Sequence, residues 1–367
     1  MNGTLQCRFA ARSAAIVGLA FLLVGAAFAQ HYTRTDVTTN SSSVSSAPNV
    51  DPNLVNPWGL SRATGSPWWI SDNGTGLSTL YDGTGAIQSL VVTVPTPDGV
   101  QGTSAPTGTV FNYTTSFEVA PGQPAIFLFV TEDGTISGWN PTVDFANAIR
   151  VVNRPKNAIY KSCAIATTAN GPRFYASNFK TGNVEVYDAN FHRVYREEKF
   201  HDSTLPAHYA PFGLQNVGGN IVVAYAQRDP GSTDENHGPG LGHVTIFDTD
   251  GHILLRLEHG SFMNAPWGIA QAPGDFGTFS HRLLIGNFGD GTIHAFNPLT
   301  GKLEGTLLDS TGANLWIDGL WALSFADASG ANGSATDLYF TAGPNDESNG
   351  VLGKITATAT ENRGNSE

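Results

Sequence analysis

Hydrophobic positions in this chain fall in short alternating runs separated by turn residues. The clearest example extends from Asn264 to Gly301 and reads N-A-P-W-G-I-A-Q-A, then R-L-L-I-G-N-F-G-D-G-T-I-H-A-F-N-P-L-T-G after a short insertion. It predicts an inner strand at 267–270, a buried strand at 283–286 and an alternating strand at 292–296. Gly, Asn and Asp separate these runs, as is typical of an antiparallel meander.

The same unit recurs six times. Inner runs such as N-P-W-G-L-S (56–61), A-P-F-G-L-Q (210–215) and G-L-W-A-L-S-F (319–325) each precede two further strand patterns. The marker positions of the six units are separated by 49 to 55 residues and are Trp58, Val110, Cys163, Phe212, Trp267 and Trp321. That period, with strands of a few residues, is typical of propeller blades.

The first five units have room for a fourth, outer strand, for example at 87–94, 193–200 and 253–258, but the sixth does not. An orphan strand pattern at 32–38 lies near the other end of the chain and is followed by a Ser/Asn/Pro-rich linker at 40–52. Adding this strand to the sixth unit would close the ring and remove an exposed sheet edge. We therefore predict an all-β, six-bladed propeller of four-stranded antiparallel blades, with residues 30–56 as closing strand and linker and 57–358 as the propeller. Residues 359–367 are predicted to be a disordered tail.

The N-terminus has the pattern of a signal peptide. Arg8 and Arg12 precede an apolar run at 14–27, and Ala27-Phe28-Ala29 gives a small-x-small cleavage site before Gln30. The apolar run is shorter than the roughly 20 residues of a membrane span. We expect residues 1–29 to be removed and the protein to be secreted to the periplasm or the medium, with no membrane span after cleavage.

The charge of the chain limits the kinds of partner that it can bind. Without its signal peptide the chain has 17 Lys and Arg residues against 31 Asp and Glu residues, a net charge near −14. Such an acidic chain repels phosphate backbones, so we expect no nucleic-acid partner. Cys163 is the one cysteine after the cleavage site, and its apolar neighbours predict a small buried core residue. We expect a monomer.

Several of these segments resemble a known family. The runs N-L-V-N-P-W-G-L, Y-A-P-F-G-L, N-A-P-W-G-I-A, G-N-F-G-D-G-T-I and I-D-G-L-W-A-L look like an uncharacterised bacterial propeller family met in organisms with PEP-CTERM sorting systems. The looser similarity is to six-bladed propellers of the NHL and lactonase/gluconolactonase type. The chain ends E-N-R-G-N-S-E, without a Pro-Glu-Pro motif. A soluble secreted form is therefore favoured over surface sorting.

In such a meander the loop before each inner strand and the loop between the second and third strands share one face. We predict a ligand site on that face, on an aromatic floor studded with amides. Its candidate residues are Trp58, Asn73, Asn178, His208, Phe212, Trp267, Asn287, Asp318 and Trp321. The alternatives are that the aromatic segments are structural plugs, that the Asn residues serve their turns, and that His208 is a surface residue.

The loop at 228–243 is the longest insertion on this face. It carries Asp229, Asp234, Glu235, His237 and His243, and long loops of this kind often cover binding sites. Its spacing matches no known metal motif, so a solvated acidic lid is the favoured interpretation over a cation site.

Two functions stay open. The first is a binding propeller for a small-molecule, glycan or protein ligand. The second, implied by the lactonase-type resemblance, is a metal-assisted hydrolase or lyase with a divalent cation such as Ca²⁺ held by Asn73, Asn178 and Asn287 together with Asp318 or Glu132. No complete catalytic constellation can be named from the sequence, so binding is the favoured hypothesis.

Overall fold

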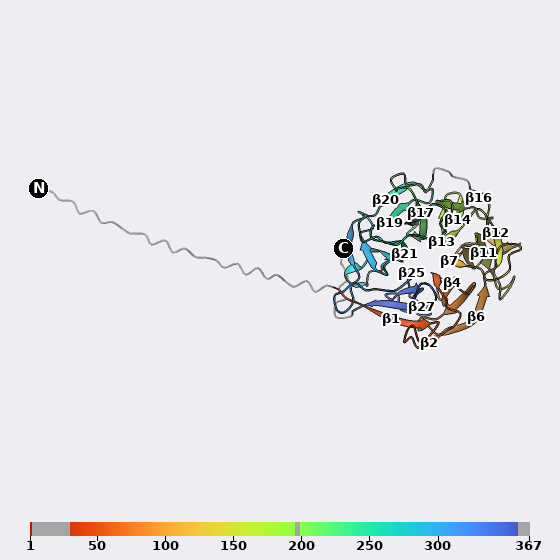
Figure 1. The fold of residues 1–367 in the computed structure, drawn as a ribbon, viewed down its shortest axis with the longest axis horizontal. Coiled ribbons are helices and arrows are strands. Elements are labelled where there is room, and N and C mark those ends of the chain that lie inside the picture. Colours follow the sequence, from red (N-terminus) through yellow and green to blue (C-terminus); the bar gives the residue numbers. More distant parts are fainter. Residues whose placement is uncertain (2–29, 195–198, 359–367) are drawn as a thin grey trace.

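The computed structural model describes Met1 and residues 30–194 and 199–358. Six small sheets are arranged in a ring around a central channel (Figure 1). Each contains an antiparallel meander whose strands follow the chain from the axis outward, and the sixth sheet also includes strands from the N-terminal segment. The prediction of a six-bladed all-β propeller is therefore confirmed.

Each of the first five blades has four strands in chain order. Blade 1 contains β3 (Pro57–Ser61), β4 (Trp68–Asp72), β5 (Leu77–Tyr81) and β6 (Ile87–Thr93); blade 2 contains β7 (Pro106–Phe111), β10 (Phe127–Thr131), β11 (Thr135–Trp139) and β12 (Ile149–Asn153); blade 3 contains β13 (Tyr160–Thr168), β14 (Gly171–Asn178), β15 (Asn183–Tyr187) and β16 (Arg193–Val194); blade 4 contains β17 (Tyr209–Val217), β18 (Asn220–Gln227), β19 (Gly242–Phe247) and β20 (Ile253–Arg256); and blade 5 contains β21 (Pro266–Gln271), β22 (Leu283–Asn287), β23 (Ile293–Phe296) and β24 (Leu303–Thr306).

Blade 6 is completed by the N-terminal strand, as predicted. It contains β25 (Leu320–Phe325), β26 (Leu338–Ala342) and β27 (Val351–Ala357), and β27 pairs antiparallel with β1 (Tyr32–Thr39). A two-residue strand, β2 (Asn49–Val50), then adds to β1 in parallel, within the segment expected to be only a linker. Pairing the two ends of the ring in one sheet leaves no open blade edge at the closure point.

Smaller elements lie in the loops. A hairpin of β8 (Glu118–Ala120) and β9 (Gln123–Pro124) lies between β7 and β10, and a single 3₁₀ turn, η1 (Gly277–Phe279), precedes β22. The predicted signal peptide after Met1 and the predicted tail 359–367 lie outside the described residues, as do residues 195–198 of the outer strand predicted at 193–200.

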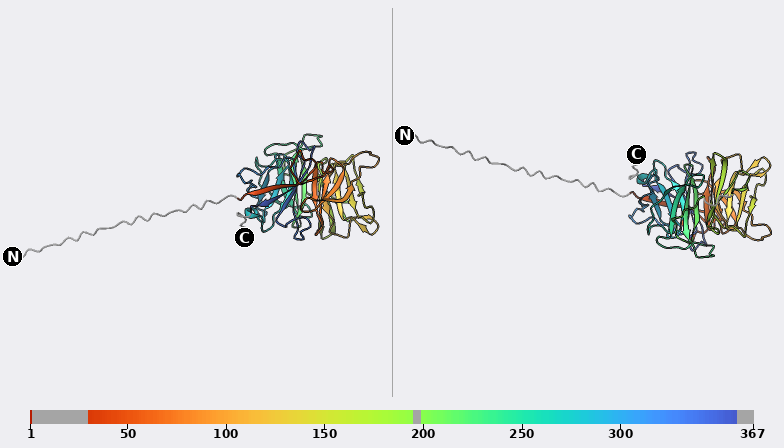
Figure 2. Two further views of the ribbon diagram at one scale, coloured as in Figure 1. Left: turned by 90° about the horizontal axis from the view of Figure 1, so that it is seen from below. Right: turned by 90° about the horizontal axis from the view of Figure 1, so that it is seen from above.

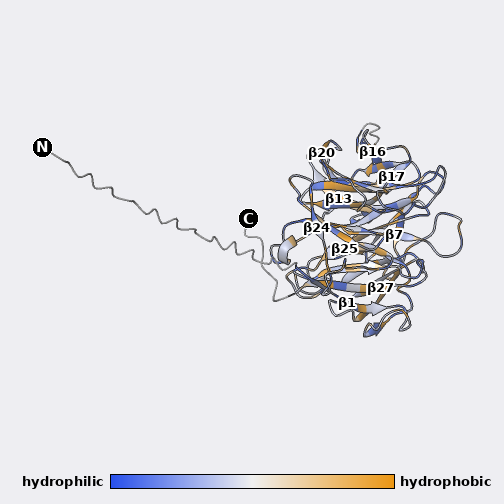
Figure 3. Ribbon diagram, turned by 60° about the vertical axis from the view of Figure 1, so that its left-hand side comes forward, coloured by the Kyte–Doolittle hydropathy of each residue, from blue (hydrophilic) through white to orange (hydrophobic). Residues whose placement is uncertain are grey.

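Apolar packing holds neighbouring blades together. The described residues form six hydrophobic clusters. Five of them each join two adjacent blades, and the sixth surrounds the axis with residues of blades 1, 3, 4, 5 and 6. Between blades 1 and 2, for instance, Trp69 stacks on Phe127 with ring centroids 4.2 Å apart. Hydrophobic and polar residues alternate along many of the strands (Figure 3). Seen from the edge, the strands run between the two faces of the ring (Figure 2).

The recurring P-W-G and P-F-G motifs have a physical explanation at the channel. The inner strands of adjacent blades approach so closely that a Cβ at Gly59 would lie 2.5 Å from the carbonyl oxygen of Thr107, and one at Gly268 2.6 Å from that of Trp321. A side chain at either position would push the inner strands apart. The glycine therefore lets the ring close tightly around its axis, and the residue before it is free to fill that axis.

Candidate functional site

Six equivalent residues define one end of the channel, which we call the upper mouth. They lie at or beside a β-bulge in each inner strand, and such bulges re-aim side chains. The six residues are Trp58, Thr107, Lys161, Phe212, Trp267 and Trp321. In blades 2 and 3 this corrects the marker positions expected from sequence. Val110 and Cys163 lie further along their strands, and Thr107 and Lys161 take the equivalent places.

Aromatic rings close the channel at this end. Trp58 stacks on one side of Trp321 with centroids 3.6 Å apart, and Phe288 stacks on Trp321 at 3.9 Å. The rings of Phe212 and Trp267 both contact the ring of Trp58 edge-on, and Phe212 also contacts Trp321 in this way. All five aromatic side chains are buried. The predicted aromatics do meet on the axis, where they form a packed plug.

Lys161 is the exception within this plug. Its side chain is only 1% exposed, and its ammonium lies 5.0 Å from the centre of the Trp58 ring and 5.8 Å from that of Phe212. Burial alone would lower the pKa of Lys161, but Glu132 and Glu235 outweigh it and raise the pKa above its usual range. The structure therefore holds a protonated lysine on the axis of the propeller.

Carboxylates from two loops surround this ammonium. Glu132, in the β10–β11 loop, accepts a hydrogen bond from Lys161 Nζ at 2.6 Å. Asp234 and Glu235, in the long β18–β19 loop, lie 3.5 and 3.8 Å from the same atom. The side chain of Glu235 is 5% exposed, and its Oε2, the oxygen 3.8 Å from Lys161 Nζ, is buried and accepts no hydrogen bond. The ion pair with Lys161 is therefore what offsets the burial of this oxygen.

Glu347 enters the mouth from the β26–β27 loop. Asn345, Asp346 and Glu347 have φ values of 56°, 53° and 62°, so three consecutive residues other than glycine occupy the left-handed region. Each costs about 1 kcal/mol or more, and strain of this kind gathers at functional sites. Burial, followed by the negative charges of Glu235 and Glu132, raises the pKa of Glu347 to about 7, although a hydrogen bond from Asn56 Nδ2 opposes the shift.

His237 completes the cluster. Its Nε2 lies 3.5 Å from Glu235 Oε1, and its ring packs edge-on against Phe288 with centroids 5.0 Å apart. The hydrogen bond to Glu235 raises the pKa of His237 despite its partial burial. We refer to Glu132, Lys161, Asp234, Glu235, His237 and Glu347 as the charged cluster. Loops and strands of blades 2, 3, 4 and 6 supply it, and Asn56 from the start of blade 1 binds it.

The amide residues predicted for the site have two different placements. Asn73 lies at the cluster, where its Nδ2 donates to Glu132 Oε2 at 2.9 Å. Asn178 is buried and donates to Glu185 Oε1 and to the carbonyl of Asn157. Asn287 donates to the carbonyl of Phe262 and contacts Asp290, so these two amides serve the hydrogen bonding of their own blades. A ligand role for them stays a prediction.

The two remaining predicted residues support loops of the mouth. Asp318 Oδ2 accepts a hydrogen bond from the backbone of Asn345 at 3.0 Å, which holds the strained turn before Glu347. His208 is exposed with φ 71°, and its carbonyl accepts from the backbone of Arg228, at the start of the β18–β19 loop.

A divalent cation does not fit this donor set. The described part of the chain contains no group of three or more His, Cys, Asp and Glu residues arranged to hold a metal ion. The converging carboxylates instead share the ammonium of Lys161, which supplies the positive charge that such a cation would bring. The titratable residues of the predicted loop at 228–243 also separate, because His243 lies in β19 and stacks on His259 at 4.1 Å, while Asp234 and Glu235 lie near Lys161.

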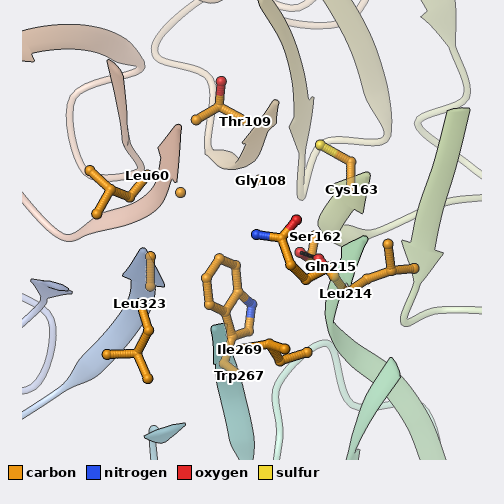
Figure 4. A pocket seen from close by; sticks show the side chains of 12 residues that line it. Leu60, Gly108, Thr109, Ser162, Cys163, Leu214, Gln215, Trp267, Ile269 and Leu323 are labelled. Atoms are coloured by element: carbon orange, nitrogen blue, oxygen red, sulfur yellow. Dashed lines mark hydrogen bonds between the residues drawn. The ribbon is translucent and has the colours of Figure 1, made fainter. Parts of the chain in front are cut away.

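The opposite end of the channel has no Asp, Glu, Lys, Arg or His among the described residues that line its cavity. A cavity of about 30 Å³ is lined by residues that follow the bulges, among them Leu60, Thr109, Cys163, Gln215 and Leu323 (Figure 4). That volume is enough for about one or two water molecules. Cys163 is free and buried, as predicted, and burial raises its pKa. We call this region the lower end.

Comparisons with known proteins were made by sequence and by structure. No family model matches the chain. Uncharacterized protein R648 of Acanthamoeba polyphaga mimivirus is 30% identical over 327 residues, which cover 86% of this chain and 78% of the relative. Uncharacterized protein L690 of the same virus is 29% identical over 324 residues, or 84% and 82% of the two chains.

The chain belongs to the family of these mimivirus proteins. These relatives are viral, and they give no support to the expected link with PEP-CTERM organisms. Among solved structures, a glucose dehydrogenase superposes with a TM-score of 0.52 at 12% identity, covering 89% of this chain and 100% of that one. A streptogramin B lyase gives 0.50 at 11%, covering 89% and 98%. At these identities the likeness shows the fold of the family and leaves its chemistry open.

Among the helical segments of the described residues, none is long and apolar enough to cross a bilayer.

Proposed function

We propose that this member of the family is a secreted binding propeller whose ligand docks at the upper mouth, on the charged cluster. One observation carries the proposal, namely the convergence of six ionisable side chains from four blades on the channel axis. Three of the other five axis positions carry Trp and one carries Phe, so an aromatic side chain is the ordinary filling here. A buried lysine surrounded by carboxylates contributes little net stability to a fold compared with an apolar side chain of similar size. Recognition of a ligand is therefore the better explanation for a lysine at this position.

The chemistry of the mouth favours a ligand rich in hydrogen-bond donors. Four carboxylates, on Glu132, Asp234, Glu235 and Glu347, outnumber the two cationic groups of Lys161 and His237. Asp234 is 76% exposed, while the Glu235 carboxylate next to it is buried, and its Oε2 lies 3.8 Å from Lys161 Nζ without accepting a hydrogen bond. Hydroxyl groups of a glycan or amino groups of a small molecule or protein would satisfy these acceptors.

A binding screen with matched variants tests this proposal. Soluble oligosaccharides and the polyamine spermidine would be titrated into the mature protein by calorimetry. Glu235→Gln keeps the shape of the side chain but removes its charge, and we expect it to weaken binding by about 1.5–3 kcal/mol. Glu118→Gln, on the exposed hairpin β8–β9 away from the mouth, is the control. Ligands that bind both variants equally well would place recognition elsewhere.

An enzymatic hydrolase or lyase is the second candidate. It is favoured by Glu347, whose pKa of about 7 suits general acid–base catalysis at neutral pH. Hydrolysis of lactone and ester substrates would be measured for the wild type and for Glu347→Gln. Turnover that falls at least about a hundredfold in the variant would establish the enzyme, and no turnover in either protein would leave the binding function.

Treatment with a chelator tests whether such an enzyme would depend on a metal ion. With Lys161 as the resident cation, we expect EDTA or added Ca²⁺ to leave the melting temperature unchanged within about 1 °C. A metal bound only by the native state would instead stabilise it by several degrees, and such a shift would show that these donors hold a metal after all.

A further inference from the structure

A second concave site lies on blade 3, apart from the charged cluster. The β12–β13 loop, the β14–β15 turn and strand β16 surround a surface hollow of about 560 Å³. Its lining residues are Arg154, Lys156, Asn157, Lys180, Thr181 and Arg193. These elements lie next to one another at the rim of the ring, where β12, β14 and β16 are labelled in Figure 1. We propose that this hollow binds the phosphate or sulfate group of a small molecule.

The charge of the hollow contrasts with that of the whole chain. Four of the 19 Lys and Arg residues line this one site, although the chain has a net charge of −12. Lys156 and Lys180 are exposed and form no ion pair with any residue that the structure describes. A fifth cation, Arg228, donates from Nη2 to the carbonyl of Lys180 at 3.1 Å. Cations concentrated in this way attract an anion locally even on an acidic protein.

One buried carboxylate organises the two arginines without neutralising the site. Glu185, 5% exposed, accepts from Arg154 Nη2 at 3.1 Å and from Arg193 Nη1 at 3.0 Å. The hydroxyls of Tyr160 and Tyr187 donate to its other oxygen. Against burial, these bonds keep the pKa of Glu185 below its usual value, so it stays ionised. Among the described residues that line or directly bond this hollow, one negative charge is thus set against four positive ones, a balance of about +3.

The guanidinium of Arg154 points to the same chemistry. Its side chain is 24% exposed and lines the hollow, and its bond to Glu185 uses Nη2. A guanidinium offers its N–H groups in a fixed fork that fits the oxygens of a phosphate or sulfate group, while lysine ammonium groups add point charges around them. A dianion would balance most of the excess charge, whereas a single carboxylate would balance only about a third of it.

The size of the hollow and the charge of the chain indicate which kind of molecule bears the phosphate or sulfate group. The volume is in the range of small-molecule sites and exceeds what one tetrahedral ion fills. A nucleic acid or another long polyanion would extend beyond the hollow and be repelled by the net charge of −12 of the chain. A small phosphorylated or sulfated molecule, such as a sugar ester, meets both conditions.

The test is a calorimetric titration of the mature protein at constant ionic strength set with NaCl, because salt screens exposed charges. The probes are inorganic phosphate, glucose 6-phosphate and, as the uncharged control, glucose. The double variant Lys156→Ala/Lys180→Ala should bind glucose 6-phosphate about tenfold more weakly or worse. Lys302→Ala, an exposed lysine of blade 5, should bind it within about twofold of the wild type.

Each result of these titrations either supports or overturns the proposed anion site. Tighter binding of glucose 6-phosphate than of inorganic phosphate supports a small phosphorylated ligand, and equal binding supports the site with the free ion as its ligand. Binding of neither anion would overturn the proposal, as would an equal loss in the Lys302 control. Both target lysines are exposed, so circular dichroism should show the double variant folded. Because none of these residues belongs to the charged cluster, either result leaves the function proposed for the upper mouth standing.

Discussion

The two ends of the central channel are built from the same six inner strands, yet they differ in almost every physical respect. At the upper mouth Lys161 is buried within the aromatic plug and contacts carboxylates, and a loop with three left-handed residues brings Glu347 to it. Two residues further along the same strand, Cys163 lines the small cavity of the lower end, among Leu60, Leu214 and Leu323. The lower end is explained by packing alone. The upper mouth contains buried charge and strain that packing does not require, and such features point to function.

The largest effect should come from removing the central cation. Lys161→Met keeps the length of the side chain but leaves Glu132 and Glu235 without their partner. We expect the free energy of unfolding to fall by about 3–5 kcal/mol at pH 7. Urea denaturation at pH 7 measures the loss. A loss of less than about 1 kcal/mol would mean that the carboxylates do not depend on this positive charge.

The lower end provides the contrasting case. Leu323 is 3% exposed and lines the cavity of the lower end. Leu323→Ala enlarges this cavity and should lower the free energy of unfolding by about 2–4 kcal/mol. Because the site contains no ionised group, the loss should be the same at pH 4.5 and pH 8. A marked pH dependence in this variant would contradict the distinction between the two ends.

Glu347 should make a smaller contribution with a defined pH window. Its pKa is about 7 in the folded protein and about 4.5 when unfolded. Between these values the folded state retains a proton that the unfolded state loses, so stability falls as the pH rises from about 4.5 to 7. Glu347→Gln can still accept from Asn56 but does not titrate. Relative to the wild type it should gain about 1–3 kcal/mol across that window.

Thermal melts of both proteins from pH 4.5 to 8.5 measure this difference, and titration common to both largely cancels. Parallel curves would show that the pKa of Glu347 is near its usual value, and general acid–base catalysis by this residue would then have no basis.

The smallest effect belongs to Thr109, again at the lower end. Its buried Oγ1 has no hydrogen-bond partner, and valine has nearly the same shape. Thr109→Val should therefore leave the stability unchanged or raise it by up to about 1 kcal/mol. A loss of more than about 1 kcal/mol in urea denaturation would show that the hydroxyl is bonded to water in the cavity, and that this end is more polar than its lining indicates.

The fold could be read from the sequence because its signals are local and repeated. Strand runs such as that at 283–286 are bounded by turn residues, and counting strands per unit left one gap that the pattern at 32–38 fills. The aromatic residues Trp58, Phe212, Trp267 and Trp321 were also placed correctly on the axis. The short strand β2 was missed, because two residues in a polar segment carry no periodic signal.

The charged cluster could be predicted only in part. Asp234, Glu235 and His237 were noted in an acidic loop, but tertiary contacts decide which of them turn inward. Lys161 was missed because the third unit was aligned on Cys163. Aligning Tyr160-Lys161-Ser162 with Pro-Trp-Gly would have shown a lysine at an axis position. Glu347 gave no signal, since left-handed turns favour glycine and this one has none.

The closure of blade 6 also fixes the order in which the molecule can fold. β1 is the first strand of the propeller to be synthesised, but its partner β27 is the last, and Tyr32 pairs with Ala357. Joining segments so far apart costs about 5 kcal/mol in chain entropy before any contact compensates for it, and such non-local pairing slows folding. A nascent chain can therefore assemble meander after meander, while the ring itself closes only after β27 has been synthesised.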